Sequence, residues 1–241
     1  MSDAMAFVIG RVAFMLTAAL LCSTTVSAYA HEEDFIDETL VYGTLEQGAV
    51  EPQYWFDIGR NDPGNFIRHS LAVEYGITDH WMVDCRATGI EERRNGFHLD
   101  SSRLETRYRF FQEGTLPIDI AASGELNSRR DEEGHQIIGI EPRLILSKGF
   151  GKLNLTLNFA AEFPFNRHSP TVETRGGLEY DVSNFFHIGS EFSYDTEQHA
   201  VAVIPQIWLT LPHNVTLKTG YSHDFGATHE RFLRTAIVVE F

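Results

Sequence analysis

The segment LNLTLNFAAEF, residues 153–163, alternates apolar with mostly polar side chains from end to end. One set of alternate positions is apolar and consists of Leu153, Leu155, Leu157, Phe159, Ala161 and Phe163. The positions between them carry Asn154, Thr156, Asn158, Ala160 and Glu162. Because successive side chains of a β-strand point to opposite faces, this period of two predicts a strand with one apolar and one polar face.

The same alternation recurs along the chain, for example in RLETRYRF (103–110) and PIDIAASGELN (117–127). It predicts twelve strands, at residues 51–59, 66–75, 81–90, 99–111, 117–127, 135–147, 153–163, 171–180, 185–194, 200–211, 215–222 and 230–241. Most of them exceed the roughly 5–6 residues of a typical soluble strand. Their length suits a tilted strand that crosses a lipid bilayer.

The connections between these segments alternate in length. Every second one is short: GITDH (76–80), QEGTL (112–116), SKGFGK (147–152), DVSN (181–184) and PHN (212–214). Those between are longer and more charged: RNDPGN (60–65), EERRNGFH (91–98), SRRDEEG (128–134), PFNRHSP (164–170), DTEQH (195–199) and HDFGATH (223–229). This contrast is typical of outer-membrane barrels. We therefore expect an all-β fold: a closed antiparallel transmembrane β-barrel of about twelve strands, with short periplasmic turns and longer outer loops.

Aromatic residues gather at the ends of the predicted strands. At the turn end they are Tyr75, Trp81, Phe110, Tyr180, Phe185 and Phe241, and at the loop end Phe163, Tyr194 and Tyr221. Two aromatic girdles at the membrane interfaces predict this placement. The alternative is the general preference of aromatic residues for strands.

The last predicted strand contains RFLRTAIVVEF, residues 231–241. Its alternation places Leu233, Ile237, Val239 and Phe241 toward lipid, and Arg234 and Glu240 toward the lumen. We expect this strand to pair with the first one, which leaves no open edge in lipid. A strand that ends this way on Phe241 resembles the signal read by the barrel-assembly machinery. We therefore expect that machinery and outer-membrane lipid as partners.

The N-terminal residues have the features of a targeting segment. The apolar run VAFMLTAALL (12–21) precedes the small-residue pattern at Ala28–Ala30, which predicts a cleaved signal peptide over residues 1–30. Residues 31–49 are acidic and are expected to form a periplasmic lead-in, with the barrel at 50–241. Cleavage would remove Cys22 and leave Cys85 alone, so no intrachain disulfide is expected. After residue 30, no apolar run approaches the roughly 20 residues of a membrane helix.

The face opposite the apolar stripe carries many charges. Its candidate pore-lining residues are Asp84, Arg86, Arg107, Arg109, Glu125, Glu141, Arg143, Glu162, Glu173, Arg175, Glu191, Lys218 and Arg234. In lipid each would cost several kcal/mol, so they are expected in the lumen. The alternative to an open pore is a lumen filled by ion pairs, although twelve strands enclose more space than side chains normally fill.

These charges predict a passive outer-membrane channel, similar to porins, that selects a small solute electrostatically. No cofactor is expected. The formal charge of −15 argues against a nucleic-acid partner, because phosphate binding needs a basic surface.

A second functional hypothesis is the capture of copper or zinc at the outer rim. Six of the eleven histidines lie in or beside predicted outer loops: His98, His135, His168, His199, His223 and His229. Imidazole is a common ligand of both metals. No recognised ligand spacing accompanies these residues, so they do not define a metal site.

A third hypothesis, a lipid hydrolase, rests on the motifs RHS at 68–70 and 167–169 and SHD at 222–224. Adjacent residues of a strand point to opposite faces, so neither RHS motif can form a catalytic His–Ser pair by itself. The SHD motif lies at a loop, where it could meet a carboxylate. An enzyme is not predicted.

Two further patterns concern the hairpins and the prolines. EYGITDHW (74–81) and EYDVSNFF (179–186) echo each other, which we interpret as recurring turn chemistry rather than duplication. Pro142 and Pro205 each lack a ladder donor within a predicted strand, which predicts a bulge or different strand limits.

The hairpin LAVEYGITDHWMV (71–83), with the aromatic last strand, resembles outer-membrane transporters of the MetA-type phenol-degradation group. An EYG-[IL]-T-D turn recurs between barrel strands of that group. The resemblance covers residues 50–241 loosely. It implies a barrel of similar size that moves small organic compounds across the outer membrane, and it implies no catalytic residue.

Overall fold

The computed structural model describes residues 34–37, 39–61, 64–92, 96–130, 134–165, 169–196, 200–225 and 230–241. Within these ranges no helix is long and apolar enough to cross a membrane. The strands are β1 (Val50–Asn61), β2 (Gly64–Thr78), β3 (Trp81–Glu92), β4 (Gly96–Arg109), β5 (Asp119–Arg130), β6 (Gln136–Phe150), β7 (Leu153–Pro164), β8 (Thr171–Ser183), β9 (Phe186–Asp195), β10 (Ala200–Leu211), β11 (Val215–Asp224) and β12 (Arg231–Val239). The predicted signal peptide, residues 1–30, lies outside the described residues.

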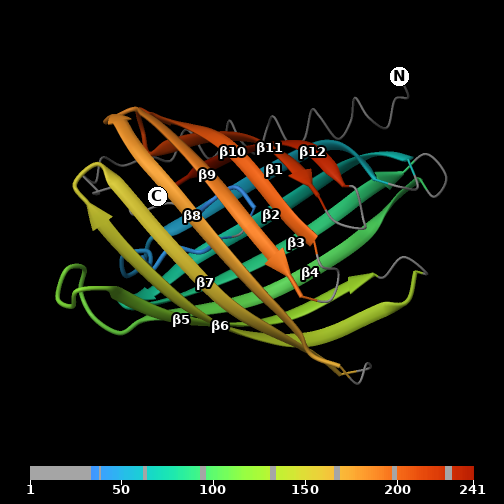
Figure 1. Cartoon of the computed structure of the whole chain (residues 1–241), viewed down its shortest axis with the longest axis horizontal. Coiled ribbons are helices and arrows are strands. Elements are labelled where there is room, and N and C mark those ends of the chain that lie inside the picture. The colour runs from blue at the N-terminus through green and yellow to red at the C-terminus, as the bar shows by residue number, and fades with distance from the viewer. Residues whose placement is uncertain are drawn as a thin grey trace.

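The twelve strands close into one antiparallel barrel (Figure 1). Each strand pairs with its neighbours in the chain, and β12 pairs with β1 from Gln53 opposite Val238 to Arg60 opposite Arg231. The predicted closed all-β barrel is confirmed, including the closure by the last strand. Closure gives every strand two partners, as a barrel in lipid requires.

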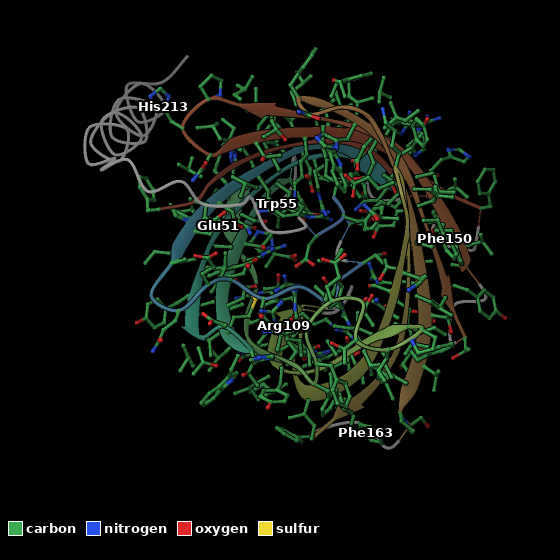
Figure 2. The ribbon with its side chains drawn as sticks, turned by 90° about the vertical axis from the view of Figure 1, so that its left-hand side faces the viewer. Glu51, Trp55, Arg109, Phe150, Phe163 and His213 are labelled. Carbon is green, nitrogen blue, oxygen red and sulfur yellow. The ribbon has the colours of Figure 1, made fainter. Side chains whose placement is uncertain are left out.

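Side chains alternate between the two faces of the wall as predicted. On β7, Leu155 and Phe159 are exposed on the outside, whereas Thr156 and Asn158 are buried inside. All nine aromatic residues assigned to the girdles are exposed, which fits their predicted place on the outer surface. Figure 2 looks along the barrel from its turn end and shows Phe150 and Phe163 outside the ring of strands and Trp55 inside it.

The two ends of the barrel differ less in connection length than the sequence predicted. At the turn end the connections are residues 79–80, 110–118, 151–152, 184–185 and 212–214. Four of these are short, but the one that contains QEGTL takes nine residues because β4 ends at Arg109 and β5 begins at Asp119. At the loop end several strands extend into the predicted loops, because continued pairing satisfies backbone hydrogen bonds.

Pro142 and Pro205 produce neither a bulge nor a change of strand limits. Both side chains are exposed on the outside of the wall. The β6–β7 ladder skips from Ile140–Phe163 to Arg143–Ala160, and the β10–β11 ladder skips similarly beside Pro205. The register is the same on both sides of each gap. Each proline has no backbone N–H to donate, and the ladder beside it is interrupted at that point without a change of register.

Candidate functional site

All thirteen predicted pore-lining residues lie on strands with their side chains buried or half-buried. They are spread along the wall, and most belong to ion pairs between neighbouring inward positions. Arg103 contacts Asp84 and Glu125 at 3.2 and 3.6 Å, and Arg143 contacts Glu141 at 2.5 Å. Further pairs are Arg175–Glu173 at 2.9 Å and Arg129–Glu162 at 2.8 Å. Arg103 and Arg129 were not among the candidates, although the same alternation points them inward.

The lumen also contains a stretch of chain that precedes β1. We call the described residues 34–37 and 39–45 the inner segment. Its apolar members are buried: Phe35, Ile36, Leu40, Val41, Tyr42 and Leu45. Figure 1 shows this part of the chain, in blue, within the barrel. These residues belong to the stretch predicted as a periplasmic lead-in. In the structure they pack against the inner wall, where a twelve-stranded barrel has space to fill.

Polar side chains of the wall hold the backbone of the inner segment. The Glu191 carboxylate accepts hydrogen bonds from the backbone N–H groups of Asp37 and Thr39 at 2.9 and 2.8 Å, and from the Thr39 hydroxyl at 2.5 Å. The Asn158 side chain accepts from Leu40 N–H and donates to Leu40 O, both at 2.8 Å. Buried backbone polar groups require such partners, so these contacts fix the path of the segment.

Basic side chains hold Asp34. Arg107 donates to both carboxylate oxygens of Asp34, at 2.5 and 2.9 Å, and to the carbonyls of Val41 and Gly43 at 3.2 Å. Lys218 donates to the Asp34 carbonyl at 2.7 Å. Burial alone would raise the pKa of the Asp34 carboxyl, but the charge and hydrogen bonds of Arg107 outweigh it and hold that pKa below its usual value.

Asp37 is also held by basic side chains of the wall, which come from β12 and β8. Arg234 donates to the Asp37 carboxylate and to the Ile36 carbonyl, both at 3.0 Å, while its other nitrogens pair with Asp57. Arg175 contacts the carbonyl of Asp37. Five predicted pore-lining residues therefore meet around the inner segment: Arg107, Arg175, Glu191, Lys218 and Arg234.

Apolar contacts complete the seat of the inner segment. The Phe35 ring packs edge-on against Trp208 with centroids 5.3 Å apart. Gly177 on β8 leaves room for this ring, since a Cβ there would overlap it. Ile36 belongs to a buried cluster with Trp55, Ile204 and Ala236, and Leu40 and Tyr42 cluster with Ala121 and Ile145. The segment is thus packed as well as hydrogen-bonded.

A cavity of about 320 Å³ lies at the turn end, beside the inner segment. Tyr42, Trp208, Glu179, Asp181 and His187 are among its lining residues. His187 Nδ1 lies 2.6 Å from an Asp181 oxygen and 3.2 Å from a Glu179 oxygen. Glu179, Asp181 and His187 were not among the site residues predicted from the sequence. Alternation places Glu179 and Asp181 on the same face of β8, and the hairpin register sets His187 opposite Asp181.

The loop histidines do not assemble into a metal site among the described residues. His98, His135 and His223 belong to no group of three metal-ligating side chains there, and the group that exists is Glu179, Asp181 and His187. His168, His199 and His229 lie outside the described residues.

The RHS motif at 68–70 shows the separation that alternation predicts, and the RHS motif at 167–169 lies partly outside the described residues. His69 bonds to the hydroxyl of Tyr54 at 2.7 Å, whereas the adjacent Ser70 is buried and bonds to Thr88 across the β2–β3 ladder. In SHD, Ser222 is buried, and the ring of His223 lies 4.4 Å from that of Phe225. Neither arrangement brings a serine to a histidine.

Comparison with known proteins supports the fold. No family model matches the chain, and no curated protein matches its sequence. The chain is similar in structure to the KdgM porin (TM-score 0.62, 10% identity, 79% of this chain and 99% of that one). It is also similar to an outer-membrane channel of Pseudomonas putida F1, with a TM-score of 0.60 and 14% identity over 87% of this chain and 100% of that one. The NanC porin gives a TM-score of 0.59 and 11% identity over 76% of this chain and 98% of that one.

At these identities the likeness concerns the fold. The closed barrel of twelve strands, its apolar exterior and these structural neighbours point to the bacterial outer membrane.

Proposed function

We propose that the protein is an outer-membrane channel for small solutes, and that the inner segment controls how far its lumen is open. The observation that carries this proposal is a polar, ionised wall that encloses the inner segment and contacts it through hydrogen bonds and ion pairs. Glu191, Arg107 and Arg234 hold this segment through hydrogen bonds and ion pairs. Because these contacts are noncovalent, the proposal is that the inner segment can leave its place in the lumen while β1 stays in the wall.

The charge of the lumen favours cations. Among the described residues, the buried charged side chains comprise nine carboxylates and five basic groups. Low-dielectric walls focus such a field, and rings of carboxylates select cations in other channels. Asp34 and Asp37 of the inner segment add to the negative charge while the segment is in place.

The solute is expected to be small. The resemblance of the β2–β3 hairpin to the phenol-degradation group extends the proposal to small organic compounds. The structural neighbours support a channel role in general, and the KdgM structure contains a disordered oligogalacturonate. That ligand belongs to KdgM, and the excess of carboxylates here argues against an acidic sugar as the preferred solute.

The test is electrical recording from the refolded full-length chain in planar lipid bilayers. We expect discrete conductance steps and, under a KCl gradient, a reversal potential whose sign indicates preference for K⁺. A gel shift on heating confirms that the barrel is folded in the same preparation. Silent bilayers with a normal gel shift would overturn the channel, and a reversal potential of opposite sign would overturn the cation preference alone.

A further inference from the structure

The cavity at the turn end contains a group of side chains that the channel proposal does not use. Glu179 and Asp181 come from β8 and His187 comes from β9, on the two sides of the hairpin that ends at residues 184–185. One oxygen of each carboxylate and one ring nitrogen of His187 all lie within 4.8 Å of one another. An imidazole and two carboxylates form a mixed nitrogen and oxygen set that suits a divalent transition metal.

The distances are close to those that such an ion needs. Zn²⁺ binds imidazole nitrogen and carboxylate oxygen at about 2.0–2.2 Å, which sets tetrahedral ligand atoms roughly 3.3 Å apart. His187 Nδ1 is 3.2 Å from Glu179 and 2.6 Å from Asp181. A small outward shift of Asp181, whose side chain is 35% exposed, would admit the ion. Glu179 is buried and provides a fixed ligand.

The surroundings orient the imidazole. His187 Nε2 lies 3.3 Å from the Thr210 hydroxyl, which can accept a hydrogen bond from Nε2–H, so that Nδ1, the nitrogen that faces both carboxylates, is the one that ligates. Metal-binding histidines commonly donate their second ring N–H in this way. The ring also lies beside Trp208, with centroids 6.4 Å apart.

The cavity supplies the remaining coordination positions. The three ligands line a cavity of about 320 Å³, and Asn154 and Asn184 line it as well. Water molecules or the side-chain amides can therefore complete the coordination sphere of the ion. Lys218 is buried and donates a hydrogen bond to the Asp34 carbonyl of the inner segment. Lys148 lines the same cavity and is the basic group that an incoming cation would meet.

We propose that Glu179, Asp181 and His187 bind one divalent transition-metal ion, Zn²⁺ or an ion of similar size, in the cavity at the turn end of the barrel. This site is separate from the outer loops and does not depend on the channel proposal. Tyr42 of the inner segment lines the same cavity, so an occupied site lies next to that segment.

The test is calorimetric titration of Zn²⁺ into the refolded full-length chain without a histidine tag. We expect one site per chain, and we expect His187→Ala to weaken it roughly tenfold or more. Asp181→Asn, which keeps the side-chain shape, should weaken it in the same direction and covers the case in which His187→Ala fails to fold.

The matched control is His80→Ala, because His80 occupies the tip of the β2–β3 hairpin, where no such ligand group is present among the described residues. Its affinity for Zn²⁺ should stay within about twofold of the parent. Absence of binding, or binding unchanged by both His187→Ala and Asp181→Asn, would overturn the proposal. The second result would assign the Zn²⁺ to other histidines.

Discussion

The hairpins β2–β3 and β8–β9 begin from similar sequences and serve different purposes. Each has a two-residue connection, 79–80 or 184–185, and a shift in register near it. Each also turns a buried glutamate inward, Glu74 in the first and Glu179 in the second. Similar turn chemistry therefore gives similar hairpins.

The difference lies two residues after the glutamate. In the first hairpin this position is Gly76, whose backbone bonds to Gly48 and Ala49 at 2.8 and 3.0 Å, and a Cβ there would overlap the carbonyl of Glu46. In the second hairpin it is Asp181, which faces the cavity. The first hairpin thus holds the chain that enters the barrel, and the second leaves a polar space. The two hairpins therefore differ in the residue at this inward position, glycine in the first and aspartate in the second.

The largest expected effect is that of Arg107→Ala, near the hairpin that holds the entering chain. It removes the partner of Asp34 and Glu105 and leaves two carboxylates in the lumen without this guanidinium. Breaking a buried ion pair costs about 3–5 kcal/mol. We expect the free energy of unfolding to fall by this amount, measured by urea unfolding of the protein in lipid vesicles. Arg109→Ala, two residues along β4, removes an exposed hydrogen bond from Arg109 Nε to the Asp79 carbonyl and should cost less than about 1 kcal/mol. Equal losses would contradict this account.

Asp34→Asn tests the same contact from the inner segment. Loss of the charge-assisted bonds to Arg107 should lower the free energy of unfolding by about 1.5–3 kcal/mol. Because the pKa of Asp34 is lowered in the folded chain, its ion pair contributes fully above the ordinary aspartate pKa of about 3.9 and is lost as the pH falls below it. The difference in the free energy of unfolding between Asp34→Asn and the parent should therefore persist from neutral pH to about pH 4 and become smaller at lower pH.

The control for this pH series is Glu113→Gln, at an exposed position of the β4–β5 connection, which should change stability by less than about 0.5 kcal/mol. A difference between Asp34→Asn and the parent that disappears well above pH 4 would show that Asp34 is not held as an anion.

Gly76→Ala tests the close approach that distinguishes the first hairpin. The added Cβ would overlap the backbone of Glu46, and such overpacking costs about 1–3 kcal/mol. The matched variant is Gly124→Ala on β5, where an added Cβ meets nothing within 4 Å, and it should be nearly neutral. Thermal unfolding followed by the gel shift measures both. A neutral Gly76→Ala would show that the entering chain is not fixed at this hairpin.

The smallest effect is expected in the second hairpin. Asp181 is partly exposed and pairs with His187, so Asp181→Asn should cost about 0–1 kcal/mol in the absence of metal. Urea unfolding in the presence of a chelator measures it. A loss as large as that of Gly76→Ala would remove the distinction between the two hairpins.

The sequence predicted the wall well because lipid and lumen impose opposite demands on alternate residues. It could not tell which inward charges form ion pairs with each other. The alternation along a strand shows that a side chain faces the lumen, but it does not show which other side chain it contacts. Glu191 and Arg234 meet the inner segment across more than 150 residues of chain. A signal was present in the apolar residues Phe35, Ile36, Leu40 and Val41, which a solvated lead-in would not need. Glu179 and His187 could have been found by extending the alternation to the hairpin tip.

Under the proposed function, the inner segment occupies the conducting path. This is tested by comparing the single-channel conductance of the parent chain with that of a variant lacking residues 34–45. With both barrels showing a normal gel shift on heating, we predict a clearly larger and steadier conductance for the deletion. An unchanged conductance would contradict the claim, because it would mean that ions pass without meeting the inner segment.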